Sequence, residues 1–293
     1  MICNLCPRRC AAVRENDKFG GACQSESAAR VARAAVHRGE EPCISGTEGS
    51  GTVFFSGCPL GCVFCQNSEI SLGHFGKSVS DKRLSEIFKE LCALGVHNIN
   101  LVTPTHFTDA IINALELYSP PVPVVWNSSG YELAESLRRL EGKVSIFMPD
   151  MKYSDNRLAA RYSNAKDYFE VAKEAILEMF RQVGAYKLDE NGILQSGVII
   201  RHLVLPENLE NTFGVIDWVR DYFDDGDILF SLMAQYTPAG KLDGFPELKR
   251  PINAIEYEQV SRYLFDSGIE DGYIQDPDAA GEDFIPDFDL SGV

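Results

Sequence analysis

Three closely spaced cysteines form the stretch of this chain that is best suited to chemistry. Cys58, Cys62 and Cys65 stand at C-x3-C-x2-C spacing in one short loop, directly after the β-branched and aromatic run 53–55. Zinc sites usually use two C-x2-C pairs, and an ordinary four-iron cluster uses four thiolates. Three thiolates in one loop can instead ligate three irons of a four-iron (4Fe-4S) cluster and leave the fourth iron open. An open iron can bind and reduce a small molecule.

A second set of four cysteines lies near the N-terminus. Its spacing is C-x2-C-x3-C-x12-C, and Gly20 and Gly21 stand before the last cysteine, as a tight turn back to a metal requires. Four thiols suit either a tetrahedral zinc ion or a four-thiolate iron–sulfur cluster, and the spacing does not separate the two. The alternative is a cysteine-rich arm with free thiols. The predicted ligands of this second site are Cys3, Cys6, Cys10 and Cys23.

Cysteine count and charge argue against several classes of protein. Seven of the nine cysteines belong to the two sets, and an odd count would leave one disulfide partner missing, so reduced, metal-binding thiols are the better interpretation. The net charge of −16 and the lack of a basic stripe argue against nucleic acid as the primary partner. No apolar run approaches the ~18 residues of a membrane span, and the N-terminus lacks the apolar core of a signal peptide. We therefore expect a cytoplasmic protein that does not associate with membranes.

The order of strands and helices predicts the fold. Strand-like runs near residues 53, 100, 124, 146, 200 and 230 alternate with helical patterns at about 80–95, 108–117, 131–140, 156–183, 210–222 and 254–265, and a hairpin turn stands at 189–192. This alternation indicates parallel β/α units, and six of them fit an α/β fold of the partial (β/α)6 TIM-like barrel type. We expect a cysteine-rich N-terminal module at 1–50 and the barrel at 51–270. The acidic C-terminal segment 271–293 contains apolar residues and is expected to dock across the barrel as a lid.

Candidate binding residues follow the strands, because ligands in such folds lie at the carboxyl ends of the strands. Asp150 and Lys152 are two residues apart and can both face the barrel mouth. Arg201, in the fifth strand, can clamp a carboxylate through two hydrogen bonds or bridge strands inside the barrel. The remaining candidates are Phe64 and Gln66 in the cysteine loop, Thr103 and Thr105 after the second strand, Asn127 and Ser128 after the third, and Gln235 and Tyr236 after the sixth.

The cysteine loop, with a strand before it and Phe64 just before the third cysteine, resembles the signature of the radical S-adenosylmethionine (SAM) superfamily. The longer context resembles uncharacterised homologues of pyruvate formate-lyase activating enzyme, and the resemblance extends over nearly the whole chain. It implies a 4Fe-4S cluster on Cys58, Cys62 and Cys65, with SAM on the open iron through its amino and carboxylate groups. The matching segments are 31–35, 41–46, 98–106, 149–153 and 232–236.

The resemblance also implies roles for single residues. The Asp-x-Lys at Asp150 and Lys152 matches a motif at the SAM ribose and a nearby cation, and Arg201 matches an Ile-Arg strand that can hold the SAM carboxylate. Gln235 or Tyr236 is expected at the adenine. Relatives usually carry Gly-Gly-Glu after the second strand, where this chain has Thr103-Pro104-Thr105-His106, so threonine hydroxyls or backbone carbonyls would replace a carboxylate there.

The resemblance implies a radical SAM enzyme that splits SAM reductively to a 5′-deoxyadenosyl radical, which abstracts hydrogen from a protein or small-molecule substrate. The substrate that the resemblance implies is a glycyl-radical enzyme, which this protein would activate. It also implies an electron donor such as flavodoxin or ferredoxin. No residue is assigned to the hydrogen-abstraction step, because the sequence does not reveal the hydrogen donor. Two alternatives stay open: radical SAM modification of RNA or a peptide, and a non-enzymatic metal or redox-sensing module with both sites closed.

Overall fold

Six parallel strands form the centre of the molecule. The computed structural model describes residues 2–15, 18–275 and 286–293. Within them the strands lie in the order β9-β8-β6-β5-β4-β2, and each pairs in parallel with its neighbour. The sequence prediction of six β/α units is confirmed. The strands are β2 (Ser50–Phe55), β4 (Ile99–Val102), β5 (Val124–Ser128), β6 (Ile146–Pro149), β8 (Leu194–Leu203) and β9 (Leu229–Met233).

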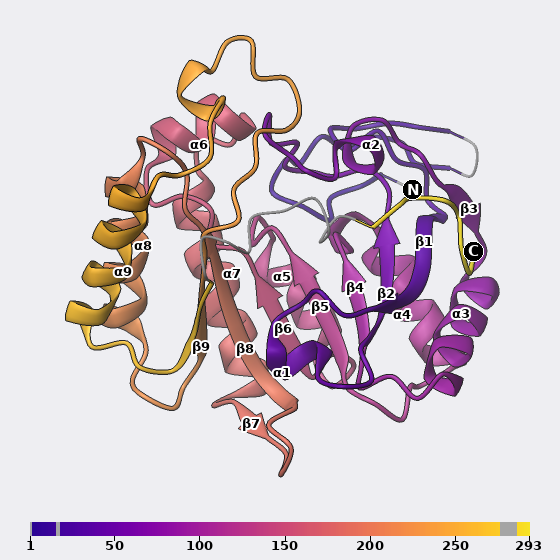
Figure 1. The fold of residues 1–293 in the computed structure, drawn as a ribbon. Coiled ribbons are helices and arrows are strands. Elements are labelled where there is room, and N and C mark those ends of the chain that lie inside the picture. Colours follow the sequence, from indigo (N-terminus) through magenta and orange to yellow (C-terminus); the bar gives the residue numbers. More distant parts are fainter. Residues whose placement is uncertain (1, 16–17, 276–285) are drawn as a thin grey trace.

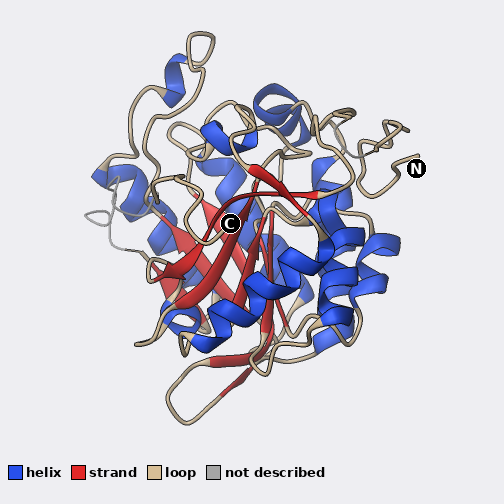
Figure 2. Ribbon diagram, turned by 90° about the vertical axis from the view of Figure 1, so that its right-hand side faces the viewer, coloured by secondary structure: helices blue, strands red, loops and turns tan. Residues whose placement is uncertain are grey.

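Every residue of β2, β4, β5, β6 and β9 is buried, as expected for parallel strands with apolar contacts on both faces. Helices pack around this sheet (Figure 2). The helices longer than one turn that follow the strands are α3 (Asp81–Ala93), α4 (Thr108–Leu117), α6 (Asn156–Ser163), α7 (Tyr168–Val183), α8 (Leu209–Tyr222) and α9 (Ala254–Ser267). Single turns are α1 (Pro42–Ser45), α2 (Ser68–Ser71), α5 (Ala134–Leu137), η1 (Thr105–Phe107), η2 (Arg138–Leu140) and η3 (Pro246–Leu248).

The helix predicted over 156–183 is in fact two helices, α6 and α7. Asn164 ends α6 in the left-handed conformation, with φ 48° and ψ 36°. Asparagine tolerates this conformation better than most residues, so it serves as a helix C-cap. The hydrophobic periodicity continues across the break, and for that reason the sequence pattern missed it. The break places the end of α6 beside the cysteine loop.

Further strands extend the sheet on both sides of the six central strands. β1 (Ala29–His37) pairs antiparallel with β2, and β3 (Lys77–Val79) pairs with β1. Residues 29–37, which the sequence analysis assigned to the N-terminal module, thus form part of the sheet. β10 (Gly272–Ile274) pairs in parallel with β9 at the opposite edge, and β7 (Lys187–Leu188) forms the predicted hairpin with β8. This hairpin projects from the end of the molecule opposite α2 and α6 (Figure 1).

The described parts of the predicted C-terminal lid lie at both edges of the sheet. β10 pairs with β9. The amide of Leu290 donates to the carbonyl of Ala32 on β1 (3.0 Å). Phe288 packs edge-on against Phe54 at 5.6 Å between ring centroids. Part of the segment, residues 276–285, lies outside the described residues. Among the residues that the structure describes, no helix is long and apolar enough to cross a membrane.

Candidate functional site

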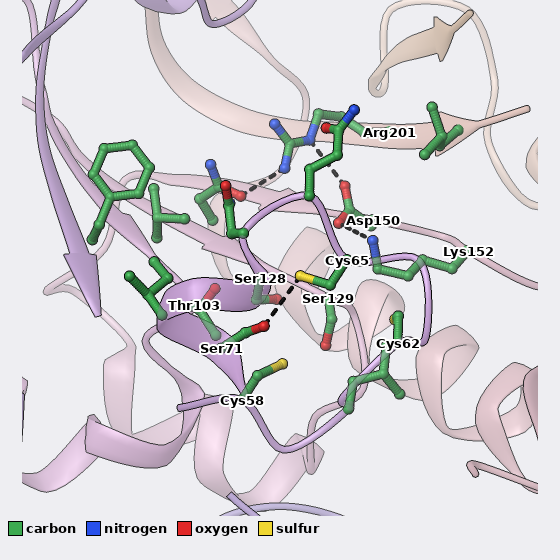
Figure 3. A pocket seen from close by; sticks show the side chains of 18 of the residues that line it. Cys58, Cys62, Cys65, Ser71, Thr103, Ser128, Ser129, Asp150, Lys152 and Arg201 are labelled. Atoms are coloured by element: carbon green, nitrogen blue, oxygen red, sulfur yellow. Dashed lines mark hydrogen bonds and ion pairs between the residues drawn. The ribbon is translucent and has the colours of Figure 1, made fainter. Parts of the chain in front are cut away.

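A polar pocket opens at the carboxyl ends of the parallel strands, next to the cysteine loop. All three cysteines of that loop line it, and so do charged residues from β6 and β8. The sulfur atoms of Cys58 and Cys65 face the same space as the Asp150–Lys152 pair (Figure 3). The predicted site residues that line the pocket are Cys58, Cys62, Phe64, Cys65, Gln66, Thr103, Asn127, Ser128, Asp150, Lys152, Arg201, Gln235 and Tyr236.

The backbone of the cysteine loop is held from two sides. The amide of Val63 donates to the carbonyl of Tyr162 on α6 (2.9 Å), and its carbonyl accepts from the amide of Lys241 (3.1 Å). Gly240 makes this second approach possible, since a Cβ there would lie 2.2 Å from the Val63 carbonyl oxygen. Any side chain at Gly240 would therefore push the two segments apart.

Arg8 fastens the same loop from the N-terminal module. Its guanidinium donates to the carbonyls of Pro59 (2.8 Å) and Leu60 (3.0 Å) in the loop. It also donates to the carbonyls of Ser163 (2.7 Å) and Asn164 at the end of α6. One side chain between two of the N-terminal cysteines thus joins the module, the cysteine loop and α6. The motif search did not find this role, because carbonyl acceptors carry no sequence signal.

Hydroxyl groups are directed at two of the loop sulfurs. Ser163 donates to the sulfur of Cys62 (3.0 Å), and Ser71 donates to the sulfur of Cys65 (3.2 Å). The hydroxyl of Tyr153 lies 2.7 Å from that of Ser163. Donors of this kind stabilise thiolate ligands and tune a cluster held by them. Sequence reasoning did not find these residues either, since they come from separate segments.

Two thiols of the cysteine loop have raised pKa values. The pKa of Cys58 is raised to about 12, mainly by burial and also by the neighbouring Cys62 and Cys65 thiols. Burial likewise raises the pKa of Cys65, and Cys62 adds to the effect. Metal ligation by thiolates would therefore release protons. In the described part of the chain no three Cys, His, Asp or Glu side chains surround a single ion. A four-iron cluster does not need such a group, because each thiolate ligates its own iron.

A buried ion network stands beside the cysteines. Arg201 donates to a carboxylate oxygen of Asp150 (3.1 Å), and Lys152 lies 2.7 Å from the other oxygen of Asp150. Burial alone would raise the pKa of Asp150, but the charges of Lys152 and Arg201 hold it below its usual range. Burial would lower the pKa of Lys152, yet Asp150 keeps it raised. Asp150, Lys152 and Arg201 are therefore all charged at neutral pH. Arg201 bridges strands and also lines the pocket, and its role in binding a carboxylate stays a prediction.

Two glutamates that the sequence analysis did not single out complete the network. Glu40 accepts from Arg201 (3.1 Å), and Glu41 lies 3.9 Å from the same guanidinium. Both belong to the connection between β1 and α1, and Glu40 lines the pocket. The matching segment 41–46 includes Glu41 but not Glu40, and neither residue follows a predicted strand.

The two threonines after β4 lie in different places. Thr103 lines the pocket and has φ +60°, a value that residues other than glycine rarely adopt, at the point where relatives usually carry Gly-Gly-Glu. Thr105 is buried in η1 and is not among the pocket residues; its hydroxyl bonds to the buried carboxylate of Glu132. At the other wall, Phe64 and Tyr236 meet edge to face at 6.0 Å, and the hydroxyl of Tyr236 donates to the carbonyl of Leu248.

The four N-terminal cysteines lie close to one another. Burial raises the pKa of Cys6 to about 12, and Cys23, Cys3 and Cys10 each contribute through their charge. Backbone amides of Ala22 and Ala12 bond to the Cys10 sulfur, and together with Arg14 they outweigh a raising effect of burial, so the pKa of Cys10 falls. Arg14 also donates to the sulfur of Cys3 (3.6 Å).

Comparison with known proteins identifies the family. Residues 52–219, more than half of the chain, match the model of the radical SAM superfamily. The chain belongs to the radical SAM superfamily. The family implies a 4Fe-4S cluster and SAM, and the pocket fits them: three thiols from one loop share it, and hydroxyl donors reach two of the sulfurs.

Individual proteins resemble the chain in sequence or in fold. The chain is 30% identical over 271 residues to the uncharacterized protein MJ0674 of Methanocaldococcus jannaschii, covering 89% of this chain and 73% of that protein. Streptococcus suis SuiB bound to its precursor peptide SuiA has a TM-score of 0.50 at 13% identity, over 75% of this chain. This chain spans about half (46%) of SuiB, so the likeness concerns the fold. A domain of pyruvate-formate lyase-activating enzyme from Bacteroides vulgatus matches over 67% of this chain and 91% of that domain, at 10% identity and a TM-score of 0.38.

Arg8→Ala is expected to loosen the cysteine loop. Removing the guanidinium leaves the carbonyls of Pro59 and Leu60 without their charged donor, a loss on the order of 1.5 kcal/mol or more. Amides of residues 57–66 should then exchange with solvent deuterium about tenfold faster or more, as measured by mass spectrometry. Arg9→Ala is the matched control, since Arg9 is exposed and, within the described residues, forms an ion pair only with the exposed Glu135. An unchanged exchange rate in Arg8→Ala would show that Arg8 does not hold the cysteine loop in place.

Ser163→Ala is expected to lower the reduction potential of the cluster. The serine hydroxyl stabilises the more negative, reduced state, and a net hydrogen bond of about 1 kcal/mol corresponds to roughly 40 mV for one electron. An EPR-monitored redox titration measures the shift. Ser85→Ala serves as control, because that hydroxyl bonds the Lys82 carbonyl on α3. An equal potential in wild type and Ser163→Ala would show that the hydroxyl does not act on the thiolate.

Proposed function

We propose that this protein is a radical SAM enzyme that splits SAM reductively and passes the resulting 5′-deoxyadenosyl radical to a substrate by hydrogen abstraction. The observation that carries the proposal is the cysteine triad, whose three side chains line a polar pocket at the carboxyl ends of the strands in a chain of this superfamily. When bound, the cluster supplies the electron that breaks the sulfonium of SAM. The protein's own side chains would bind and orient SAM and the substrate, and would exclude water from the site.

The pocket residues have chemical groups suited to different parts of SAM. Asp150 offers carboxylate oxygens suited to ribose hydroxyls, while Lys152 and Arg201 offer cations suited to a carboxylate. Phe64, Gln66, Gln235 and Tyr236 line the wall expected at the adenine. Polar groups for the remaining contacts come from Thr103, Asn127 and Ser128, which line the pocket at the ends of β4 and β5.

The first test is EPR of the anaerobically reconstituted, reduced protein with and without SAM. We expect a four-iron signal that changes when SAM is added, and formation of 5′-deoxyadenosine. Cys62→Ala should abolish cleavage, whereas Cys92→Ala, a partly buried cysteine on α3, should leave it intact. A signal indifferent to SAM with no 5′-deoxyadenosine would overturn the proposal in favour of a closed metal or redox-sensing site.

For the substrate we propose a protein, with activation of a glycyl-radical enzyme as the first candidate. Its support is the sequence resemblance to homologues of pyruvate formate-lyase activating enzyme. A peptide is the second candidate, because SuiB, which shares the fold, was solved with its precursor peptide. The net charge of −16 disfavours RNA. A low-potential donor such as flavodoxin or ferredoxin would supply the electron.

We also propose that the N-terminal cysteines hold a second metal centre. Cys3, Cys6, Cys10 and Cys23 are close enough for their charges to interact, and backbone amides bond to the sulfur of Cys10. No three of these side chains surround one ion in the described structure. Four thiols suit either a single tetrahedral zinc ion or an iron–sulfur cluster.

Metal analysis of a variant with Cys58, Cys62 and Cys65 all changed to Ala isolates this second centre. We expect about four irons per chain to remain after anaerobic reconstitution if it is a four-iron cluster. Adding Cys3→Ser and Cys6→Ser should remove them. One zinc per chain would assign zinc instead, and metal content that is unchanged by the added substitutions would eliminate the site.

A further inference from the structure

Glu40 brings a carboxylate into the pocket from outside the series of strand ends. Its side chain is 10% exposed and lines the pocket wall. One oxygen accepts from Asn100 (2.9 Å) and Asn127 (3.3 Å), and the other accepts from Arg201 (3.1 Å). A carboxylate has about four lone-pair positions, so these three bonds leave room for another donor.

The charged side chains around Glu40 include more carboxylates than cations. Three carboxylates, Glu40, Glu41 and Asp150, surround two cations, Lys152 and Arg201, so the sum is 2 − 3 = −1 when all are ionised. Burial raises the pKa of Glu41; Arg201 opposes the rise and Glu40 adds to it. Buried charge of one sign requires a partner of the other. The network therefore balances when Glu41 is protonated, the state that its raised pKa favours, and lacks one positive charge only when Glu41 is ionised.

Two buried acceptors nearby also lack a donor. Within the described residues, neither Oε2 of Glu41 nor Oδ1 of Asn100 has a hydrogen-bond partner. Turning the Asn100 amide over would not help, because its oxygen would then face the Glu40 carboxylate that its nitrogen now serves. Buried acceptors are rarely left without partners. Neither residue lines the pocket, but both are neighbours of Glu40, which does. A carboxylate with a free lone-pair position is suited to an ammonium group, which carries three donors and one positive charge.

The strand that holds Glu40 is the one whose end lacks an acid. β4 is followed by Thr103-Pro104-Thr105-His106, with no carboxylate, while Asn100 within β4 holds Glu40. A carboxylate thus reaches the same strand from the β1–α1 connection. Arg201 and Asn127 fix its position, so little reorganisation is needed when a cation binds.

We propose that Glu40 binds the ammonium group of the methionine portion of SAM, in place of the acid that relatives carry after the second strand. This inference rests on the proposed function, since it presumes that SAM occupies the pocket. SAM carries an ammonium group for Glu40 and a carboxylate for the cations Lys152 and Arg201.

Binding of three ligands to the reconstituted protein, measured anaerobically by equilibrium dialysis, tests the assignment. SAM and S-adenosylhomocysteine carry the ammonium group, and 5′-methylthioadenosine does not. Glu40→Gln should weaken binding of SAM and S-adenosylhomocysteine about tenfold, the loss for one charge-assisted hydrogen bond, and leave 5′-methylthioadenosine unchanged. Glu48→Gln is the control, because Glu48 lies in the neighbouring α1–β2 connection and is exposed.

The ratio of the SAM and 5′-methylthioadenosine affinities is the readout, because it does not depend on the folded fraction. Glu40→Asp keeps the charge and should preserve more of this ratio than Glu40→Gln. An equal loss of affinity for SAM and 5′-methylthioadenosine in Glu40→Gln would mean that Glu40 only shapes the pocket. No loss of affinity for either would mean that Glu40 does not contact the ligand. Both results would overturn the inference. Wild-type protein that binds none of the three ligands would overturn the proposed function itself.

Discussion

The buried guanidinium of Arg201 is the constraint on which the rest of the site depends. Its side chain is 13% exposed, and a charge that far from water must be paired and hydrogen-bonded. It binds Asp150 after β6, Asn127 in β5 and Glu40 before α1. The carboxyl ends of three neighbouring strands and the β1–α1 connection are thereby drawn to one point. A pocket with fixed polar walls follows from that single requirement.

The cysteine loop is positioned by backbone contacts from other segments. Tyr162 on α6, Lys241 after β9 and Arg8 in the N-terminal module each bond to main-chain atoms of the loop. Fixing a flexible loop in this way reduces the reorganisation needed when a cofactor binds. Arg8 also means that the order of the N-terminal module and the order of the loop are physically linked, because it bonds to the loop from between Cys6 and Cys10.

Much of the fold could be predicted from the sequence, but three further strands and the break between α6 and α7 could not. The six central strands were predicted because buried parallel strands are short apolar runs between helical patterns. β1, β3 and β10 were missed, since edge strands carry weak patterns and depend on a neighbour for their hydrogen bonds. The break at Asn164 was missed because apolar spacing continues through it, while a left-handed cap at a residue other than glycine leaves only a faint sequence signal.

The sequence by itself determined the family and the position of its cysteine triad, because C-x3-C-x2-C ligands lie within eight residues and their spacing alone constrains the chemistry. It also marked Asp150, Lys152 and Arg201, because parallel strands bring their ends to one edge. Only the tertiary structure decided that Glu40 enters the pocket, that Ser163 reaches the Cys62 sulfur and that Arg8 holds the loop. Those contacts join residues 161, 101 and 51 positions apart, and local pattern carries no information on which distant segments pack together.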